Sequence, residues 1–250
     1  MNFSDIKTYF QDNGRHLAAL NWYDSYQLSA AEMCAVRTSL QTFQRGEGTG
    51  GDHLLDLARK WSSADYAAAM QLFIAEEAGH AAMLGQFMDQ QGIARLQTHW
   101  LHEVFRSLGR PLGLEHMVRV ILTAEVVATI YYEALAKATK STLLLQICQR
   151  ILHDEVMHLK FHCVAIRQLS AGNKPLISWF WRQFYRALMA GTALVVYTAS
   201  NRTFRAGGYG FGRFCKAIAL EYSRVEQLQL TLGQEVGQSE ASLQFAQNQL

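Results

Sequence analysis

Proline is nearly absent from this chain, whose 250 residues include only 2. Proline ends helices, and apolar residues recur here at three- and four-residue spacing, so this scarcity favours an all-helical protein. An alternation typical of a strand appears only briefly, around residues 193–198. We therefore expect an all-α fold in a single domain spanning residues 1–250, long enough to bury one large core.

Other features that would indicate secretion or membrane insertion are also missing. The cysteines at 34, 148, 163 and 215 are scattered rather than closely paired, which indicates reduced thiols. The longest apolar run, residues 188–199, is shorter than the roughly 20 residues that a bilayer crossing needs. The first residues lack a basic stretch followed by an apolar one, so no signal peptide is expected. We predict a cytoplasmic protein without a transmembrane segment.

Acidic residues are absent from residues 156–220, although the net charge of the whole chain is only +2. Such a basic block predicts an acidic partner, an anionic substrate or contact with a membrane surface. The alternative is that its cations pair with acidic residues of the first half of the chain. The lysines and arginines concerned are Lys160, Arg167, Lys174, Arg182, Arg186, Arg202, Arg205, Arg213 and Lys216.

Against this background, one short pattern, acid-Glu-x-x-His, occurs twice. The copies are Glu-Glu-Ala-Gly-His at residues 76–80 and Asp-Glu-Val-Met-His at residues 154–158. A Glu and a His three residues apart on a helix project from one face and can bind one metal ion. Two such pairs, with one lone Glu from each of two further helices, form the dimetal carboxylate site of helical bundles.

The two lone glutamates are predicted to be Glu32 and Glu125. Glu77 lies 14 residues after Ser63, the expected start of its helix. Glu125 lies 14 residues before Thr139, and Glu155 lies 14 residues after Ser141, so the three carboxylates are expected at the same height in the bundle. A first helix ending near Arg45, before the glycine-rich segment 46–51, places Glu32 at a matching height. The predicted metal ligands are Glu32, Glu77, His80, Glu125, Glu155 and His158.

The expected helices form a four-helix bundle over residues 15–170, with a long crossover between two hairpins. They span about residues 15–45, 63–91, 112–139 and 141–170, and the bundle is followed by an aromatic, basic extension at residues 171–232. That extension is expected to contain helices at about 175–200 and 213–232. The glutamine-rich end, residues 233–250, is expected to be a frayed tail.

Apolar residues flank the predicted ligands, so their carboxylates must be neutralised, paired or coordinated. Two divalent cations would balance them, and carboxylate with imidazole suits iron, with manganese as the alternative. Glu76 and Asp154 are each placed to accept the free N–H of the ligating histidine on the opposite helix. His162, one turn beyond His158 on the same face, is expected to be a core or rim histidine with satisfied hydrogen bonds, and the alternative is that it supports the ligands from outside. Tyr131 and Tyr132 are expected to be packing residues.

These motifs resemble those of the ferritin-like di-iron carboxylate superfamily, over about residues 27–170. The resemblance implies that the six predicted ligands hold two iron ions that react with dioxygen or peroxide. The doubled motif and the spacing from Glu125 to Glu155 look more like the oxygen-activating enzymes than like the iron-storage ferritins. The region after Pro175 matches no member of that superfamily, which leaves the substrate open.

The leading hypothesis is a di-iron oxidase or oxygenase acting on an unidentified small apolar or anionic substrate. No flavin or iron–sulfur motif appears, so a separate protein or small reductant must donate electrons. One alternative is an iron-handling or peroxide-scavenging protein of ferritin or rubrerythrin type, although no Cys-x-x-Cys unit is present. Another is a binding module with structural metals. The sequence leaves the oligomeric state open, a homodimer included.

Overall fold

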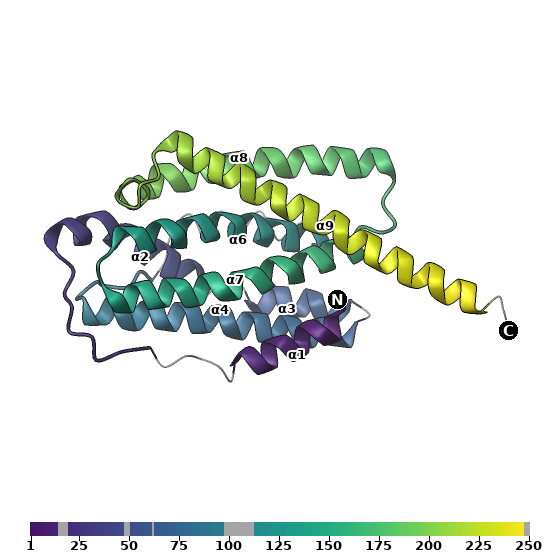
Figure 1. Ribbon diagram of the computed structural model, residues 1–250, viewed down its shortest axis with the longest axis horizontal. Helices are drawn as coiled ribbons and strands as arrows, with labels where there is room; N and C mark the ends of the chain where they lie inside the picture. The colour runs from purple at the N-terminus through teal and green to yellow at the C-terminus, as the bar shows by residue number, and fades with distance from the viewer. Residues whose placement is uncertain (15–19, 48–50, 62, 98–112, 248–250) are drawn as a thin grey trace.

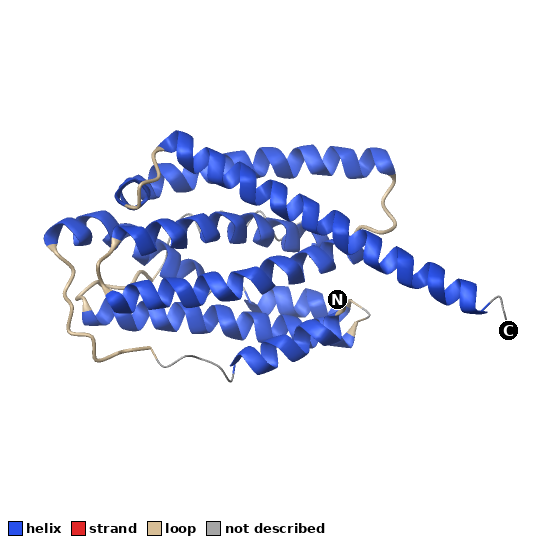
Figure 2. Ribbon diagram, in the orientation of Figure 1, coloured by secondary structure: helices blue, strands red, loops and turns tan. Residues whose placement is uncertain are grey.

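A computed structural model describes the backbone of residues 1–14, 20–47, 51–61, 63–97 and 113–247, and the side chains of these segments as far as residue 231. Every regular element in the described residues is a helix, as the sequence predicts (Figure 2). The helices are α1 (Phe3–Asn13), α2 (Ala30–Glu47), α3 (Gly51–Lys60), α4 (Ala64–Gln90), α6 (Gly113–Ala138), α7 (Thr142–Leu169), α8 (Pro175–Ala206) and α9 (Phe211–Gln247).

Helices α2, α4, α6 and α7 form the bundle (Figure 1). Serine hydroxyls cap two of them, because the Ser63 side chain accepts from the N–H of Tyr66 and the Ser141 side chain accepts from the N–H of Leu144, both at 3.2 Å. The short turn after α6 makes α6 and α7 an antiparallel hairpin. These boundaries agree with those read from the sequence, while much of the expected crossover, residues 98–112, lies outside the described residues.

The N-terminal part of the chain differs from the expectation. The sequence predicts one helix from about residue 15 to Arg45, but the structure has α1 at Phe3–Asn13 and begins α2 only at Ala30. Asn2 and Asp5 form a reciprocal capping box at the start of α1. The spacing of Phe3, Ile6 and Phe10 buries one face of that helix, which packs mainly on α4. A further short helix, α3, fills the expected linker before α4.

Helices α8 and α9 form an additional layer over α6 and α7 (Figure 1). Helix α8 starts with Pro175 in its first turn, is interrupted by non-helical dihedral angles at Ser200 and continues to Ala206. Helix α9 continues to Gln247, beyond the expected end near residue 232, and its last turns project past the bundle (Figure 1). In the described residues, no helix is long and apolar enough to cross a membrane.

Glu32 lies in the first turn of α2 and has a structural role. Its Oε2 accepts hydrogen bonds from the backbone N–H and the hydroxyl of Ser29, at 3.0 and 2.7 Å, and from the hydroxyl of Tyr26 at 2.8 Å. Its Oε1 accepts from the backbone N–H of Lys140 at 2.7 Å, in the turn between α6 and α7. Burial opposes ionisation, but these hydrogen bonds outweigh it and lower the pKa of Glu32 to about 2.

This lowered pKa predicts a pH-dependent contribution of Glu32 to stability. The carboxylate stabilises the folded state above its ordinary pKa of about 4.5, and this contribution is lost as the pH falls towards 2. We expect Glu32→Gln to lower the free energy of unfolding near neutral pH by about 1–2 kcal/mol, because solvent screens part of the effect. Urea unfolding of both proteins at a series of pH values should show the difference narrowing below about pH 4.5. A difference that stays constant with pH would contradict this role.

Candidate metal centre

The structure brings five of the six predicted ligands together inside the bundle. Glu77 and His80 come from α4, Glu125 comes from α6, and Glu155 and His158 come from α7. The side chains of the two histidines and of Glu125 and Glu155 are buried, whereas Glu77 is slightly exposed. The three-residue spacing within each motif therefore places an acid and an imidazole on the core-facing side of α4 and α7.

Glu77 is at the centre of this cluster. Its Oε1 lies 3.2 Å from Nδ1 of His158 and 3.5 Å from Nδ1 of His80. Ligand atoms of Glu77, Glu125, Glu155 and His158 all lie within 4.8 Å of one another. Bonds of about 2.1 Å to a small divalent ion hold any two ligand atoms within about 4.2 Å, so this spacing needs little adjustment to coordinate one.

The prediction that Glu32 is the sixth ligand is wrong. Glu47 of the same helix, α2, lies at the cluster instead. Glu47, Glu77 and His80 form a second group whose ligand atoms lie within 4.8 Å of one another. Because α2 begins at Ala30 and continues past Gly46, Glu32 lies at one end of the bundle and Glu47 lies about 22 Å further along the helix. The glycine-rich segment that begins at Gly46 predicts a helix end near Arg45, but α2 includes Gly46 and ends with Glu47 at the cluster.

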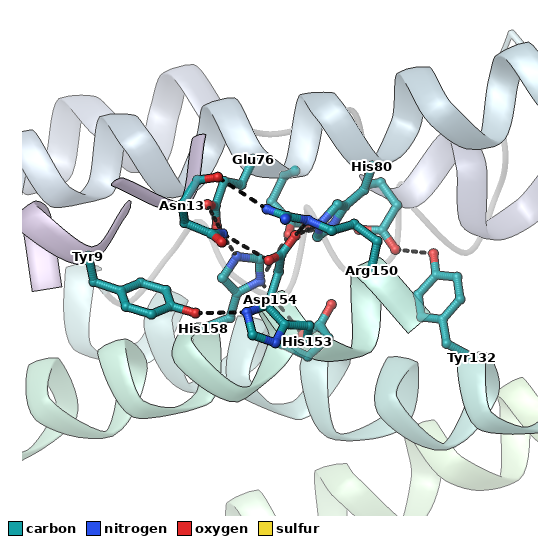
Figure 3. Close-up of polar contacts among 12 residues, drawn as sticks. Tyr9, Asn13, Glu76, His80, Tyr132, Arg150, His153, Asp154 and His158 are labelled. Atoms are coloured by element: carbon teal, nitrogen blue, oxygen red, sulfur yellow. Dashed lines mark hydrogen bonds and ion pairs between the residues drawn. The ribbon is translucent and has the colours of Figure 1, made fainter. Parts of the chain in front are cut away.

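The outer hydrogen bonds predicted for Glu76 and Asp154 are both present (Figure 3). Nε2 of His80 lies 3.1 Å from Oδ2 of Asp154 on α7, and Nε2 of His158 lies 3.0 Å from Oε2 of Glu76 on α4. Each acid therefore binds the histidine of the opposite helix. This pairing turns Nδ1 of both rings towards the cluster.

Asn13, at the end of α1, links these two acids and was not predicted. Its side-chain amide donates to Oε1 of Glu76 at 2.6 Å and to Oδ1 of Asp154 at 2.8 Å (Figure 3). Arg150 donates from Nε to Oδ2 of Asp154 at 2.9 Å. The capping box at residues 2–5 and the apolar spacing of residues 3, 6 and 10 are the sequence signals that could have located this helix. Nothing in the sequence shows that Asn13 reaches both motifs.

Tyr132 also contacts the cluster, whereas Tyr131 is a packing residue, as predicted. The hydroxyl of Tyr132 donates to Oε1 of Glu47 (Figure 3). The ring of Tyr131 stacks on Phe43 at a centroid distance of 3.5 Å, and its hydroxyl donates to Ser39 at 3.1 Å. Tyr132 therefore fixes the orientation of a carboxylate that sequence reasoning did not assign to the site.

The carboxyl groups of the cluster have divergent pKa values. Burial and then the negative charge of Glu77 raise the pKa of Glu47 well above its usual range. Burial and then the charge of Glu125 do the same for Glu155. Burial opposes ionisation of Glu77 too, but the imidazole rings of His158 and His80 beside it outweigh burial and hold its pKa well below the usual range. Without bound cations, the protein therefore favours ionisation of Glu77 but disfavours ionisation of Glu47 and Glu155.

The two histidines respond in the opposite sense. Burial disfavours the charged ring of His80, but the hydrogen bond to Asp154 and then the nearby carboxylate of Glu77 raise its pKa. Burial likewise opposes protonation of His158, while the nearby carboxylate of Glu155, the hydrogen bond to Glu76 and the nearby carboxylate of Glu77 raise its pKa well above the usual range. Divalent cations bound at the cluster would stabilise its carboxylates and displace protons from the ligand atoms.

Several buried atoms of the cluster lack a hydrogen-bond partner in the described part of the protein, and they are those that face its interior. They are Oε1 of Glu77, both carboxyl oxygens of Glu155, Nδ1 of His80, Nδ1 of His158 and both ring nitrogens of His162. An unsatisfied buried polar atom costs about 1–3 kcal/mol, so this concentration requires an external partner. Oxygen and imidazole donors in this arrangement fit two iron or manganese ions.

Comparison with solved structures finds R2-like ligand-binding oxidases. A form without metal cofactor superposes with a TM-score of 0.68 at 13% identity, covering 91% of this chain and 96% of that one. A variant with an aerobically reconstituted Mn/Fe cofactor gives a TM-score of 0.67 at 12% identity, covering 91% and 93%. No protein-family model matches the sequence, and no curated protein does.

At this level of identity, the likeness shows the fold. The chain has the all-helical, ferritin-like fold of the R2-like ligand-binding oxidases, which confirms the predicted fold class. The likeness extends over most of the chain, so it includes α8 and α9 and not only the bundle. Those two helices were the part of the sequence that matched no expected relative.

The bonds of Asn13 generate a prediction about metal affinity. Asn13→Leu removes the donor shared by Glu76 and Asp154 while keeping an apolar side chain of similar size. We expect the apparent affinity for Fe²⁺, measured anaerobically by competition with a chromophoric chelator, to fall about 10- to 100-fold. Gln11→Ala, at an exposed position of the same helix, is the matched control. Equal affinities in a variant of unchanged helix content would show that Asn13 does not support the histidines.

Proposed function

We propose that this protein is a dimetal oxidase or oxygenase that activates dioxygen to oxidise a small organic substrate. The observation that carries the proposal is the convergence of two groups of buried carboxylate and imidazole atoms that share Glu77. We assign one ion to Glu47, Glu77 and His80. The other ion is assigned to Glu77, Glu125, Glu155 and His158.

The ions, when bound, supply the redox chemistry, and the chain supplies orientation, charge balance and exclusion of water. The outer bonds of Asp154 and Glu76 hold both imidazole rings in place, and Tyr132 holds Glu47. Aromatic rings close the space around the histidines. Phe73 packs edge-on against His158 at 4.8 Å, and Phe10 lies 5.9 Å from the same ring.

We infer iron as the metal, with manganese at one position as the alternative. The donor set contains carboxylate oxygen and imidazole nitrogen and no thiolate, which suits both metals. The Mn/Fe cofactor named for a neighbour of the same fold supports the mixed alternative. Metal analysis of protein loaded with each metal alone and with both together distinguishes the two cases.

The substrate we propose is a small organic anion with an apolar body, bound between α6, α8 and α9. A cavity of about 310 Å³ lies there. Arg119 and Arg182 provide cationic groups in its wall, and the one carboxylate among its lining residues, Glu226, is bound by Arg186 at 3.0 Å. Its apolar wall includes Leu122, Met189 and Val225.

The position of this cavity supports a link to the cluster. Glu125 follows the lining residue Leu122 by one turn of α6. On the other side, the thiol of Cys163 donates weakly to the backbone carbonyl of the lining residue Val225 at 3.9 Å, and Cys163 directly follows His162 on α7. An elongated substrate in the cavity would thus approach the cluster from the side of Glu125.

The electrons are proposed to come from a separate donor, since the sequence contains no flavin or iron–sulfur motif. The basic stretch of residues 156–220 supports docking of an acidic donor. Residues 171–180 are all exposed, including Trp179 and Phe180, and Lys174 and Arg182 lie in and beside that segment. Arg186 pairs with Glu226 in α9 rather than with an acid of the first half of the chain.

A pair of variants tests the metal assignment. Wild-type protein loaded anaerobically with Fe²⁺ and freed of excess metal is expected to contain about two ions per chain. Glu47→Ala should retain about one, because it removes a carboxylate from one group only. Glu32→Gln should retain two, because Glu32 binds Ser29, Tyr26 and the turn after α6 rather than the cluster. Two ions at full occupancy in Glu47→Ala would overturn the assignment.

Exposure of the reduced, metal-loaded protein to dioxygen tests the proposed reaction class. We expect a rapid change in absorption between about 300 and 700 nm that Glu47→Ala lacks, with about two ions per chain throughout. Many ions per chain in a large cage would indicate storage instead. Two bound ions with no optical change on exposure to dioxygen would indicate structural metals and contradict the proposed function.

A further inference from the structure

His162 occupies a place in the metal centre that the assignments above do not use. It lies one turn after His158 and two turns after Glu155 on α7, so the three side chains share one face of the helix. Its ring is fully buried, and Nε2 lies 3.7 Å from Oε1 of Glu125 on α6. The ring is thus close to one of the assigned ligands, Glu125.

The surroundings of His162 leave its polar atoms unsatisfied. Phe73 packs edge-on against the ring at 4.8 Å, and Phe161 lies 5.3 Å away. Neither ring nitrogen has a hydrogen-bond partner in the described part of the protein, although a neutral imidazole carries one donor and one acceptor. The expectation of a core histidine with satisfied bonds is therefore wrong. His116 shows that expected state, since its Nδ1 lies 2.5 Å from the hydroxyl of Tyr185.

The distance to Glu125 distinguishes two roles. At 3.7 Å, Nε2 and Oε1 are too far apart for an N–H···O hydrogen bond, which spans about 2.7–3.2 Å. The same separation lies within the roughly 4.2 Å allowed to two atoms bound to one small cation. It equals the separation of His158 Nδ1 from Glu155 Oε2, which is also 3.7 Å. The spacing therefore matches that of two ligands of one ion.

We propose that His162 is a third histidine of the metal centre and binds, through Nε2, the ion assigned to Glu125 and Glu155. The inference rests on the proposed function, because it adds a ligand to that same site. His162 is not among the four residues whose ligand atoms all lie within 4.8 Å of one another, so its ring must move closer to them to bind the ion; its contact with that group is to Oε1 of Glu125. The complete donor set is then four glutamates and three histidines.

A third imidazole adds a ligand without changing the net charge of the centre. It adds a neutral donor where another carboxylate would add a negative charge, so two divalent ions and four carboxylates remain electrically balanced. It also lies next to Glu125, which follows the cavity-lining residue Leu122 by one turn of α6. The two ions therefore differ in ligand number and in access.

The test uses His162→Leu, with His116→Leu as the matched control for a buried histidine. Both are loaded anaerobically with Co²⁺, whose visible spectrum reports the ligands directly. We expect His162→Leu to bind Co²⁺ at one of the two positions at least about 10-fold more weakly, a loss already typical of outer partners. Its spectrum should change, and nuclear magnetic resonance of the Co²⁺ protein should lose the shifted imidazole signals of one of three histidines. His116→Leu should keep both the affinity and the signals.

The stability of the metal-free proteins gives a second readout. Because the ring nitrogens of His162 have no hydrogen-bond partner among the described residues, His162→Leu should leave the melting temperature of the metal-free protein unchanged or raised, whereas His116→Leu should lower it. Two Co²⁺ ions bound by His162→Leu with wild-type affinity and spectrum would overturn the inference alone. Absence of Co²⁺ binding by the wild-type protein would instead refute the proposed function.

Discussion

The structure depends on a pair of reciprocal hydrogen bonds between α4 and α7, from His80 to Asp154 and from His158 to Glu76. Each bond uses the outward nitrogen of a ring and so commits the other nitrogen to the interior. The two helices are thereby held at a rotation that also points Glu77 and Glu155 inward. The polar groups of the core are thus arranged for a ligand rather than for one another, and hydrophobic packing around them holds that arrangement. Burying a charge costs several kcal/mol per ion unless it is matched, so such an arrangement is retained only where something else completes it.

Helix α1 gives this pairing its rigidity. The amide of Asn13 binds the outer acids of both motifs at once, so neither acid can turn without disturbing the other. Phe10, one turn earlier, packs near the ring of His158 and excludes water on that side. The segment before the bundle therefore belongs to the functional centre, although the four-helix pattern would be complete without it. This coupling between two distant motifs through one amide is a property of the folded state alone.

The sequence predicts those features that repeat with the period of a helix. Both motifs, Glu125 and the outer bonds follow from spacing, because α4, α6 and α7 have clear capping serines or short turns that fix their ends. The prediction of Glu32 as a ligand fails because it places the start of this helix near residue 15 and its end near Arg45, whereas α2 spans Ala30–Glu47. Ser29 and Glu32 form a capping box, a local pattern that marks the start of a helix and could have removed Glu32 from the ligand set. Glu47 lies between Gly46 and Gly48, and glycines are unfavourable in a helix, so the sequence does not predict that the last turn of α2 extends to Glu47. The sequence could not predict that both ring nitrogens of His162 lack a hydrogen-bond partner among the described residues, because this depends on which side chains other helices place beside the ring.

The layer formed by α8 and α9 makes the two sides of the centre unequal. The end of α8 is held tightly, because a Cβ added at Gly207 would lie 2.2 Å from the carbonyl oxygen of Ala134 on α6, so only glycine allows this approach. At its other end, α8 presents Trp179 and Phe180 to solvent, and its next turns line the cavity through Arg182 and Tyr185. One end is therefore fixed on the bundle, while the other lines the cavity that we propose for the substrate. If the substrate binds there, the residues of α8 and α9, rather than those of the two motifs, determine which molecules fit.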